Sequence, residues 1–200
     1  MLLAQVTNVD FTVSPFVPIA IGFFGLGTGY LIYGPQELFG FPDRDRRVDI
    51  TTGIWGVWMP GFMQFLAGMF LFLGLTVFHT FREPALYMTA VAFTAFGVHW
   101  WAIGMGRAFG GDARPNAFMC IPFTVLSVIG AFIFFHVDDV PVALLFIGLG
   151  LVYISDFFAS LAIPIGTLAL GFFHLLTGSW LMYLTLAAVL NLAAGYSLWL

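Results

Sequence analysis

The stretch Gly61-Phe62-Met63-Gln64-Phe65-Leu66-Ala67-Gly68-Met69 decides the fold class. It lies inside an apolar run, residues 53–78, that contains no charged residue. A run of this length exceeds the roughly 20 residues that an α-helix needs to cross the hydrocarbon of a bilayer. Lipid cannot satisfy the amide of Gln64, which therefore needs partners inside a helix bundle or along a wet path. The small residues around it let neighbouring helices approach closely. The stretch predicts a membrane-spanning helix with a polar group facing the interior of a bundle.

The whole chain has the same apolar character. Of its 200 residues, 61% are hydrophobic and 8% are charged, whereas a soluble domain carries about 25% charged residues. The charges gather in four short segments, residues 43–49, 82–83, 107–114 and 138–139, and the runs between them are long enough to span a bilayer. No basic stripe suited to nucleic acid is present. We therefore expect an integral membrane protein of the plasma (inner) membrane, in contact with lipid and not with nucleic acid.

We expect one all-α domain over residues 1–200, a polytopic bundle of six transmembrane helices. The expected spans are residues 15–38, 53–79, 84–105, 117–136, 140–163 and 166–190. Short connections make sequential helices antiparallel neighbours. Five of the six arginines fall in the loops after the first and third spans: Arg44, Arg46, Arg47, Arg107 and Arg114. The positive-inside rule places those loops in the cytoplasm and both termini outside.

Enzyme signatures such as HExxH, GxSxG, CxxC and a Walker loop do not occur in the sequence, so an enzyme is not expected. His99 and His174 lie deep in the third and sixth spans. They could hydrogen-bond between helices, hold a metal or haem, or move protons, and the first of these interpretations is preferred over the second. Asp156 lies well within the fifth span, where a carboxylate is functional by default. These three residues are candidates for proton-linked steps, and no metal or other cofactor is expected.

Several segments together resemble one known family. Gly61 to Met69 is similar to a "GxxQxxAG" segment, and Thr89 to Gly97, followed by Trp100, is similar to "TAFxxYG/FGxFW". Pro115-Asn116-Ala117 resembles the "PNA" that opens a fourth helix, and Thr177-Gly178 with Tyr183, Ala187 and Leu190-Asn191 resembles the last helix. In their order and spacing these segments resemble the acetate uptake transporter family, which includes the succinate–acetate permeases. The N-terminal signature of that family, NPAPLGL, is matched loosely by Ser14 to Ile21.

The resemblance implies six-helix protomers assembled as a hexamer, each protomer with its own pore. It places a narrow point between an aromatic of the first helix, an aromatic of the third and a leucine of the fifth. By position these are Phe24, Phe96, and Leu149 or Leu151. Gln64, Asn116 and Asn191 are expected along the substrate pathway. The family's cytoplasmic termini conflict with the arginine count, which places both termini outside.

These observations predict a membrane channel or transporter for small monocarboxylates such as acetate, either passive or proton-linked. No lysine or arginine lies in the middle of a span, so no fixed cation would trap the anion. Two alternatives stay open. One is a channel for urea or short amides, which has a similar size and architecture. The other is a non-transporting accessory subunit of a larger membrane complex.

Overall fold

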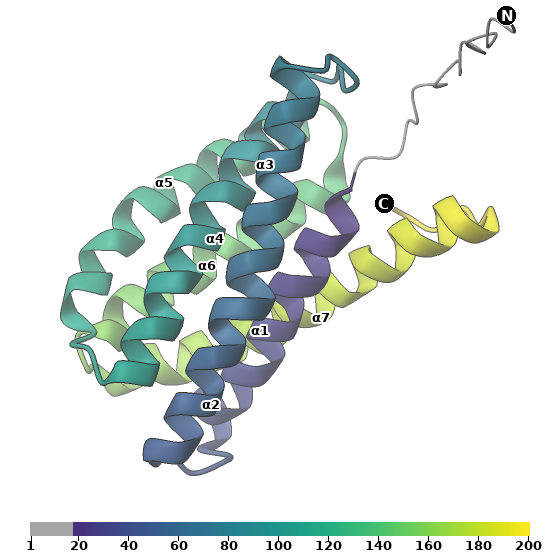
Figure 1. The fold of residues 1–200 in the computed structure, drawn as a ribbon. Helices are drawn as coiled ribbons and strands as arrows, with labels where there is room; N and C mark the ends of the chain where they lie inside the picture. The colour runs from purple at the N-terminus through teal and green to yellow at the C-terminus, as the bar shows by residue number, and fades with distance from the viewer. Residues whose placement is uncertain (1–17) are drawn as a thin grey trace, which may run out of the picture.

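Six membrane-crossing helices make up the fold that the structure describes (Figure 1). The computed structural model describes residues 18–200, within which every regular element is helical. One crossing is a continuous helix in three parts: α2 (Arg46–Gly56), the π-helical turn η1 (Val57–Phe62) and α3 (Met63–Thr76). The others are α1 (Ile19–Phe39), α4 (Ala85–Phe109), α5 (Arg114–His136), α6 (Val140–Ser160) and α7 (Pro164–Ala194). The all-α polytopic fold class is therefore confirmed.

Five of the crossings are long and apolar enough to span a membrane by composition alone, from Arg46–Thr76 onward. α1 is outside this group because its five glycines, two tyrosines and Gln36 lower the mean hydropathy of the helix. Those same residues face inward, since Gly25, Tyr30 and Gln36 are all buried. α1 is therefore a central helix of the bundle, and its weak hydropathy reflects burial against protein.

The second crossing begins at Arg46, whereas the sequence placed its start at residue 53. The cause is a helix cap, because the Asp45 carboxylate accepts hydrogen bonds from the backbone N–H groups of Arg47 and Val48, at 2.7 and 2.8 Å. The charged residues that suggested a loop form the first turns of a helix that continues beyond the apolar run. The expected start of the first span, residues 15–17, lies outside the described residues.

The π-helical turn η1 fits against a glycine face of α1. Pro60 lies in this turn, where its missing N–H and its ring disturb the α-helical ladder. A Cβ added at Gly29 would lie 2.6 Å from Pro60 Cγ, and one added at Gly25 would lie 2.5 Å from the Met59 carbonyl oxygen. Gly25 and Gly29, four residues apart on one face of α1, therefore leave the space into which this wide turn packs.

The contacts between neighbouring helices close them into a ring. α1 packs on α7 along one side and on η1 and α3 along the other, and α7 packs on α6, which packs on α5. α4 lies along α2, η1 and α3 through paired glycines, since a Cβ at Gly104 would lie 2.5 Å from the Gly53 carbonyl oxygen. The seam between α4 and α5 closes the ring and is the most sparsely packed.

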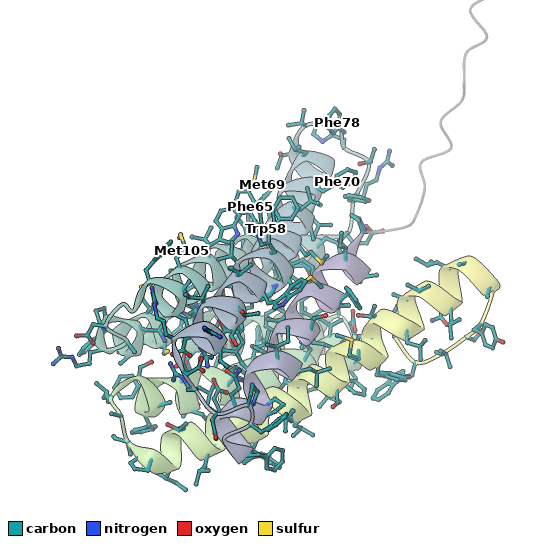
Figure 2. The ribbon with its side chains drawn as sticks, turned by 60° about the horizontal axis from the view of Figure 1, so that its bottom comes forward. Trp58, Phe65, Met69, Phe70, Phe78 and Met105 are labelled. Carbon is teal, nitrogen blue, oxygen red and sulfur yellow. The ribbon has the colours of Figure 1, made fainter. Side chains whose placement is uncertain are left out.

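Large apolar side chains cover the outside of this ring. Figure 2 labels six of them on the α2–α3 and α4 side: Trp58, Phe65, Met69, Phe70, Phe78 and Met105. Trp58, Phe70 and Phe78 are each more than half exposed, at 58%, 56% and 66%. Water would penalise such a surface, whereas hydrocarbon does not. The chain is an integral membrane protein, and this surface is suited to lipid or to another membrane-embedded protein.

Candidate functional site

A cavity of about 870 Å³ lies between the helices, toward the end that carries most of the arginines, and it extends into the α4–α5 seam, where Val98 and Met119 are 48% and 46% exposed. Arg44, Gly111 and Asp112, from the loops at that end, contribute to its wall, so the cavity opens there. α1, α4, α5, α6 and α7 all contribute to its lining. Its polar side chains are Tyr30, Tyr33, Glu37, Thr94, His99, Arg107, Asn116, Tyr153, Asp156, Ser160, Thr167 and His174. The sequence placed Asn116, Asp156, His99 and His174 on four different helices, and the structure brings all four to this one cavity.

Asp156 is held by three neutral donors. Asn116 Nδ2 lies 2.8 Å from Asp156 Oδ2, Ser160 Oγ lies 2.9 Å from Oδ1, and Cys120 Sγ lies 3.4 Å from Oδ2. Asn116 Nδ2 also lies 3.0 Å from Ser160 Oγ. α5 thus supplies the amide and the thiol, while α6 supplies the carboxylate and, one turn later, the hydroxyl. The local chain makes this possible because positions 156 and 160 share one helix face.

His99 extends this network to α4. Its Nε2 atom lies 2.5 Å from Asn116 Oδ1, so Nε2–H donates to the amide oxygen. The imidazole stacks on Phe123 with ring centroids 4.6 Å apart and an interplanar angle of 22°. Nδ1 is buried and has no hydrogen-bond partner among the described residues. The hydrogen bonds therefore run in one direction, from His99 through Asn116 to the carboxylate of Asp156.

A second histidine pair lies on the opposite wall. His174 Nδ1 of α7 lies 2.5 Å from Glu37 Oε2 of α1, and the His174 ring lies 4.4 Å from the ring of Tyr30. The side chains of His174 and Glu37 are 6% and 16% exposed. This contact joins α7 to α1 at the cavity wall.

Arg107 lies in the cavity wall at the end of α4, and two of its three guanidinium nitrogens donate to side chains of other helices. Its Nε donates to Asp49 Oδ1 at 2.9 Å, its Nη2 donates to Gln36 Oε1, and its guanidinium lies 4.7 Å from the centroid of the Tyr33 ring. Gln36 in turn donates to Thr52 Oγ1 at 3.0 Å. Arg107 therefore ties α1, α2 and α4 together.

The mouth of the cavity carries exposed ion pairs. Arg44 donates to Asp49 at 2.9 Å, and Arg114 donates to Asp112 through two nitrogens. The hydrogen bonds from the Arg114 side chain lower the pKa of Asp112 to about 2. The mouth thus holds both signs of charge, and water screens them.

Aromatic rings close the inner end. Tyr153 and Phe123, which both line the cavity, stack on each other at 5.1 Å. Phe96 lies behind them, 2% exposed, with its ring centroid 5.5 Å from each. Of the residues expected at a constriction, Phe96 is thus the one next to the cavity, and it forms part of the layer that backs it.

Phe24 and Leu151 do not meet Phe96. The side chain of Phe24 is 42% exposed, and it is the preceding Phe23 that points inward, 2% exposed, with its ring edge-on to Phe93. Leu151 is 36% exposed, whereas Leu149 is 2% exposed. A shift of one residue turns a helical side chain by about 100°, so a small error in register moves it from the core to the surface. Phe23 is thus the buried one of the two neighbours, and the narrow point with Phe24 stays a prediction.

Gln64 and Asn191 lie away from the cavity. Gln64 is fully buried, and neither its Nε2 nor its Oε1 has a partner among the described residues. Asn191 holds the C-terminal tail, because its side chain accepts from Leu198 N at 2.7 Å and donates to Leu198 O at 2.9 Å. α7 projects past the other helices at this end (yellow in Figure 1), and the tail turns back at Gly195. In the structure Asn191 therefore bonds the backbone of Leu198, and it does not line the cavity.

Sequence reasoning missed Glu37, Arg107 and Ser160. Glu37 and Arg107 fall at helix ends, where a charged residue is typical of a loop. The Asp156–Ser160 spacing of four residues was the available signal for Ser160. Within residues 18–200, no group of three or more His, Cys, Asp or Glu side chains converges to hold a metal ion.

Comparisons with known proteins now bear on this geometry. The fold is similar to that of the bacterial acetate channel SatP, with a TM-score of 0.69 and 18% sequence identity. The similarity covers 91% of this chain and 96% of that chain. No protein-family model matches the sequence, and no curated protein matches it. The chain therefore has an acetate-channel-like fold. A sequence identity of 18% supports a shared fold and nothing more.

Proposed function

We propose that this chain forms a membrane pathway for small monocarboxylates such as acetate, passive or proton-linked. The observation that carries the proposal is the cavity among the helices, with the hydroxyl groups of Tyr30, Thr94 and Tyr153 in its wall. Such donors replace the hydration that a carboxylate loses on entering. The similarity in fold to an acetate channel supports the same assignment.

The charge in the cavity favours weak binding and co-passage of a proton. Arg107 and Arg44 share the one carboxylate of Asp49 at the arginine-rich end of the cavity, and no other arginine of residues 18–200 lines it. Deeper in the cavity a carboxylate would therefore meet hydrogen-bond donors but no arginine or lysine. The neutral acid costs far less to desolvate than the anion, so a proton that travels with the cargo lowers the barrier.

The test is uptake of labelled acetate by proteoliposomes at acidic external pH. Liposomes without protein serve as the control, because the neutral acid also crosses lipid. We expect uptake above that control, saturable and competed by unlabelled acetate. Uptake equal to that of empty liposomes would contradict the proposal.

The same vesicles separate the alternatives. Swelling with urea and short amides, but no competition by acetate, would favour the urea or amide channel. A chain that is purified only together with other subunits would favour the accessory role. We propose that it assembles with copies of itself, as a hexamer by resemblance, with the arginine-rich loops in the cytoplasm of a plasma (inner) membrane.

A further inference from the structure

Within residues 18–200, Asp156 is the one acidic side chain of the inner cavity wall that no histidine or arginine side chain hydrogen-bonds. Glu37 is paired with His174, and Arg107 with Asp49. Asp156 has only neutral donors: an amide, a hydroxyl and a thiol. Asp156 is half-buried, and a half-buried charge without a counterion repels a second anion in the same cavity. An ionised Asp156 and a carboxylate cargo therefore oppose each other's presence in the cavity.

The hydroxyl hydrogen of Ser160 is committed to Asp156 while Asp156 is ionised. Ser160 Oγ donates to Asp156 Oδ1 at 2.9 Å and accepts from Asn116 Nδ2 at 3.0 Å. Asn116 Nδ2 also donates to Asp156 Oδ2 at 2.8 Å. Although Ser160 lines the cavity, its one donor is thus turned away from any ligand.

Addition of a proton to Asp156 Oδ1 reverses this bond with little movement. The new O–H donates to Ser160 Oγ, and the Ser160 hydrogen rotates about its C–O bond toward the cavity. Asn116 goes on donating to Oδ2. The cavity then has lost a negative charge and gained a hydroxyl donor on its wall.

We propose that protonation of Asp156 is the event that lets a carboxylate bind, because it removes the opposing charge and frees the Ser160 hydroxyl to donate to the cargo. One proton adds to the Asp156 carboxylate as the anion enters, and the same proton leaves when the anion leaves. The identity of the cargo rests on the proposed function. Asn116 is a positioning residue, since it acts by holding both side chains.

Other titratable groups face Asp156 from the surrounding helices. They are Cys120 of α5, Tyr153 of α6, His99 of α4, Tyr30 and Glu37 of α1, and His174 of α7. The test must therefore separate the response of Asp156 from theirs, by changing Asp156 alone.

Asp156→Asn makes this separation, because its amide reproduces the protonated carboxyl: the NH2 group can donate to Ser160 and the oxygen can accept from Asn116. Uptake by proteoliposomes is corrected for empty vesicles and divided by the concentration of acetate anion. For the wild type, this normalised uptake should fall about tenfold for each pH unit above the midpoint of its pH profile, which is the slope expected for one bound proton. The variant should show a flat profile. A variant that keeps the wild-type slope would overturn the proposal.

Asp139→Asn is the matched control. Asp139 lies at the other end of α6, where its side chain caps the helix by accepting from Val142 N at 3.2 Å. Asparagine caps helices equally well, so the fold is preserved. This variant should retain the wild-type pH slope.

Infrared spectroscopy supplies a readout that does not depend on transport. Isotope-labelled acetate is added at fixed pH to the protein in lipid nanodiscs, and the carbonyl band of protonated side-chain carboxyl groups is followed. We expect the band to grow in wild type and in Asp139→Asn, and not in Asp156→Asn. No growth in wild type overturns the proposal, whatever uptake shows. If the carbonyl band grows but no uptake is measured, the proton site at Asp156 is supported and the proposed transport function is contradicted.

Ser160→Ala tests the second half of the proposal. Loss of a hydroxyl that donates to a charged ligand should raise the KM for acetate about tenfold, while the pH midpoint set by Asp156 stays close to that of wild type. An unchanged KM would show that the freed hydroxyl does not touch the cargo.

Discussion

Asn116 Nδ2 lies 2.8 Å from Asp156 Oδ2, and this contact joins the first turn of α5 to the last turns of α6. Asn116 Oδ1 at the same time accepts from His99 of α4 across the sparsely packed α4–α5 seam. One amide thus connects three helices at the cavity wall.

Asn116→Ala should destabilise the fold by about 1–3 kcal/mol, because it leaves Asp156 short of a donor and His99 Nε2 without an acceptor. The thermal midpoint of the purified protein in detergent measures this loss. Phe118→Ala, on the same helix but 67% exposed, serves as the comparison and should lower the midpoint less. Equal losses would show that the amide bridge does not stabilise the bundle.

Gly29→Val should lower stability by about 1–3 kcal/mol, because its side chain meets the Pro60 ring, from which a Cβ at this position lies 2.6 Å. The effect appears as a lower melting temperature or loss of the monodisperse species. Gly106→Ala is the control, since nothing lies within 4 Å of the added Cβ. If Gly29→Val melts like wild type, the fit of η1 against α1 is not as described.

Arg107→Met should destabilise the protein by about 2 kcal/mol, because the side chain of Arg107 is 9% exposed and bonds Asp49 and Gln36 from two other helices. Arg114→Met removes an ion pair whose arginine is 76% exposed, and it should leave the melting temperature almost unchanged. The melting temperatures of the two variants, measured under the same conditions, test this difference. The reverse order of the two effects would contradict the structure.

Phe23→Ala should cost about 3 kcal/mol, because Phe23 fills the space beside Phe93. Phe24→Ala should cost much less, since Phe24 is 42% exposed. Thermal melting of the two variants in one detergent compares them directly. A larger loss for Phe24→Ala would restore the register that the sequence suggested.

The sequence predicted the helices well and the site in part, for one physical reason. Apolar runs near 20 residues long have few alternatives in a bilayer, so α4, α5 and α6 follow from composition. Asp156 and His99 stand out because polar groups at membrane depth are expensive. Glu37 and Arg107 did not stand out, because a charge at a helix end is as compatible with a loop as with a cavity wall.

Side-chain direction was the harder part. Phe23 and Phe24 are chemically identical neighbours, and the tertiary packing of α1 on α4 decides which of them is buried. Gln64, the polar group that suggested a wet interior, is buried away from the cavity. The sequence showed that the interior holds polar groups, and the fold determined that Asn116, Asp156 and Ser160 are the ones at the cavity.

The most direct test of the cavity as the cargo pathway is acetate uptake by two tryptophan variants of α6. Val152 lines the cavity, whereas Ile154, two residues on, is 47% exposed on the outer face. Both proteins are first shown to elute as wild type. We predict that Val152→Trp abolishes uptake and that Ile154→Trp transports acetate like wild type. Undiminished uptake by Val152→Trp would contradict the account.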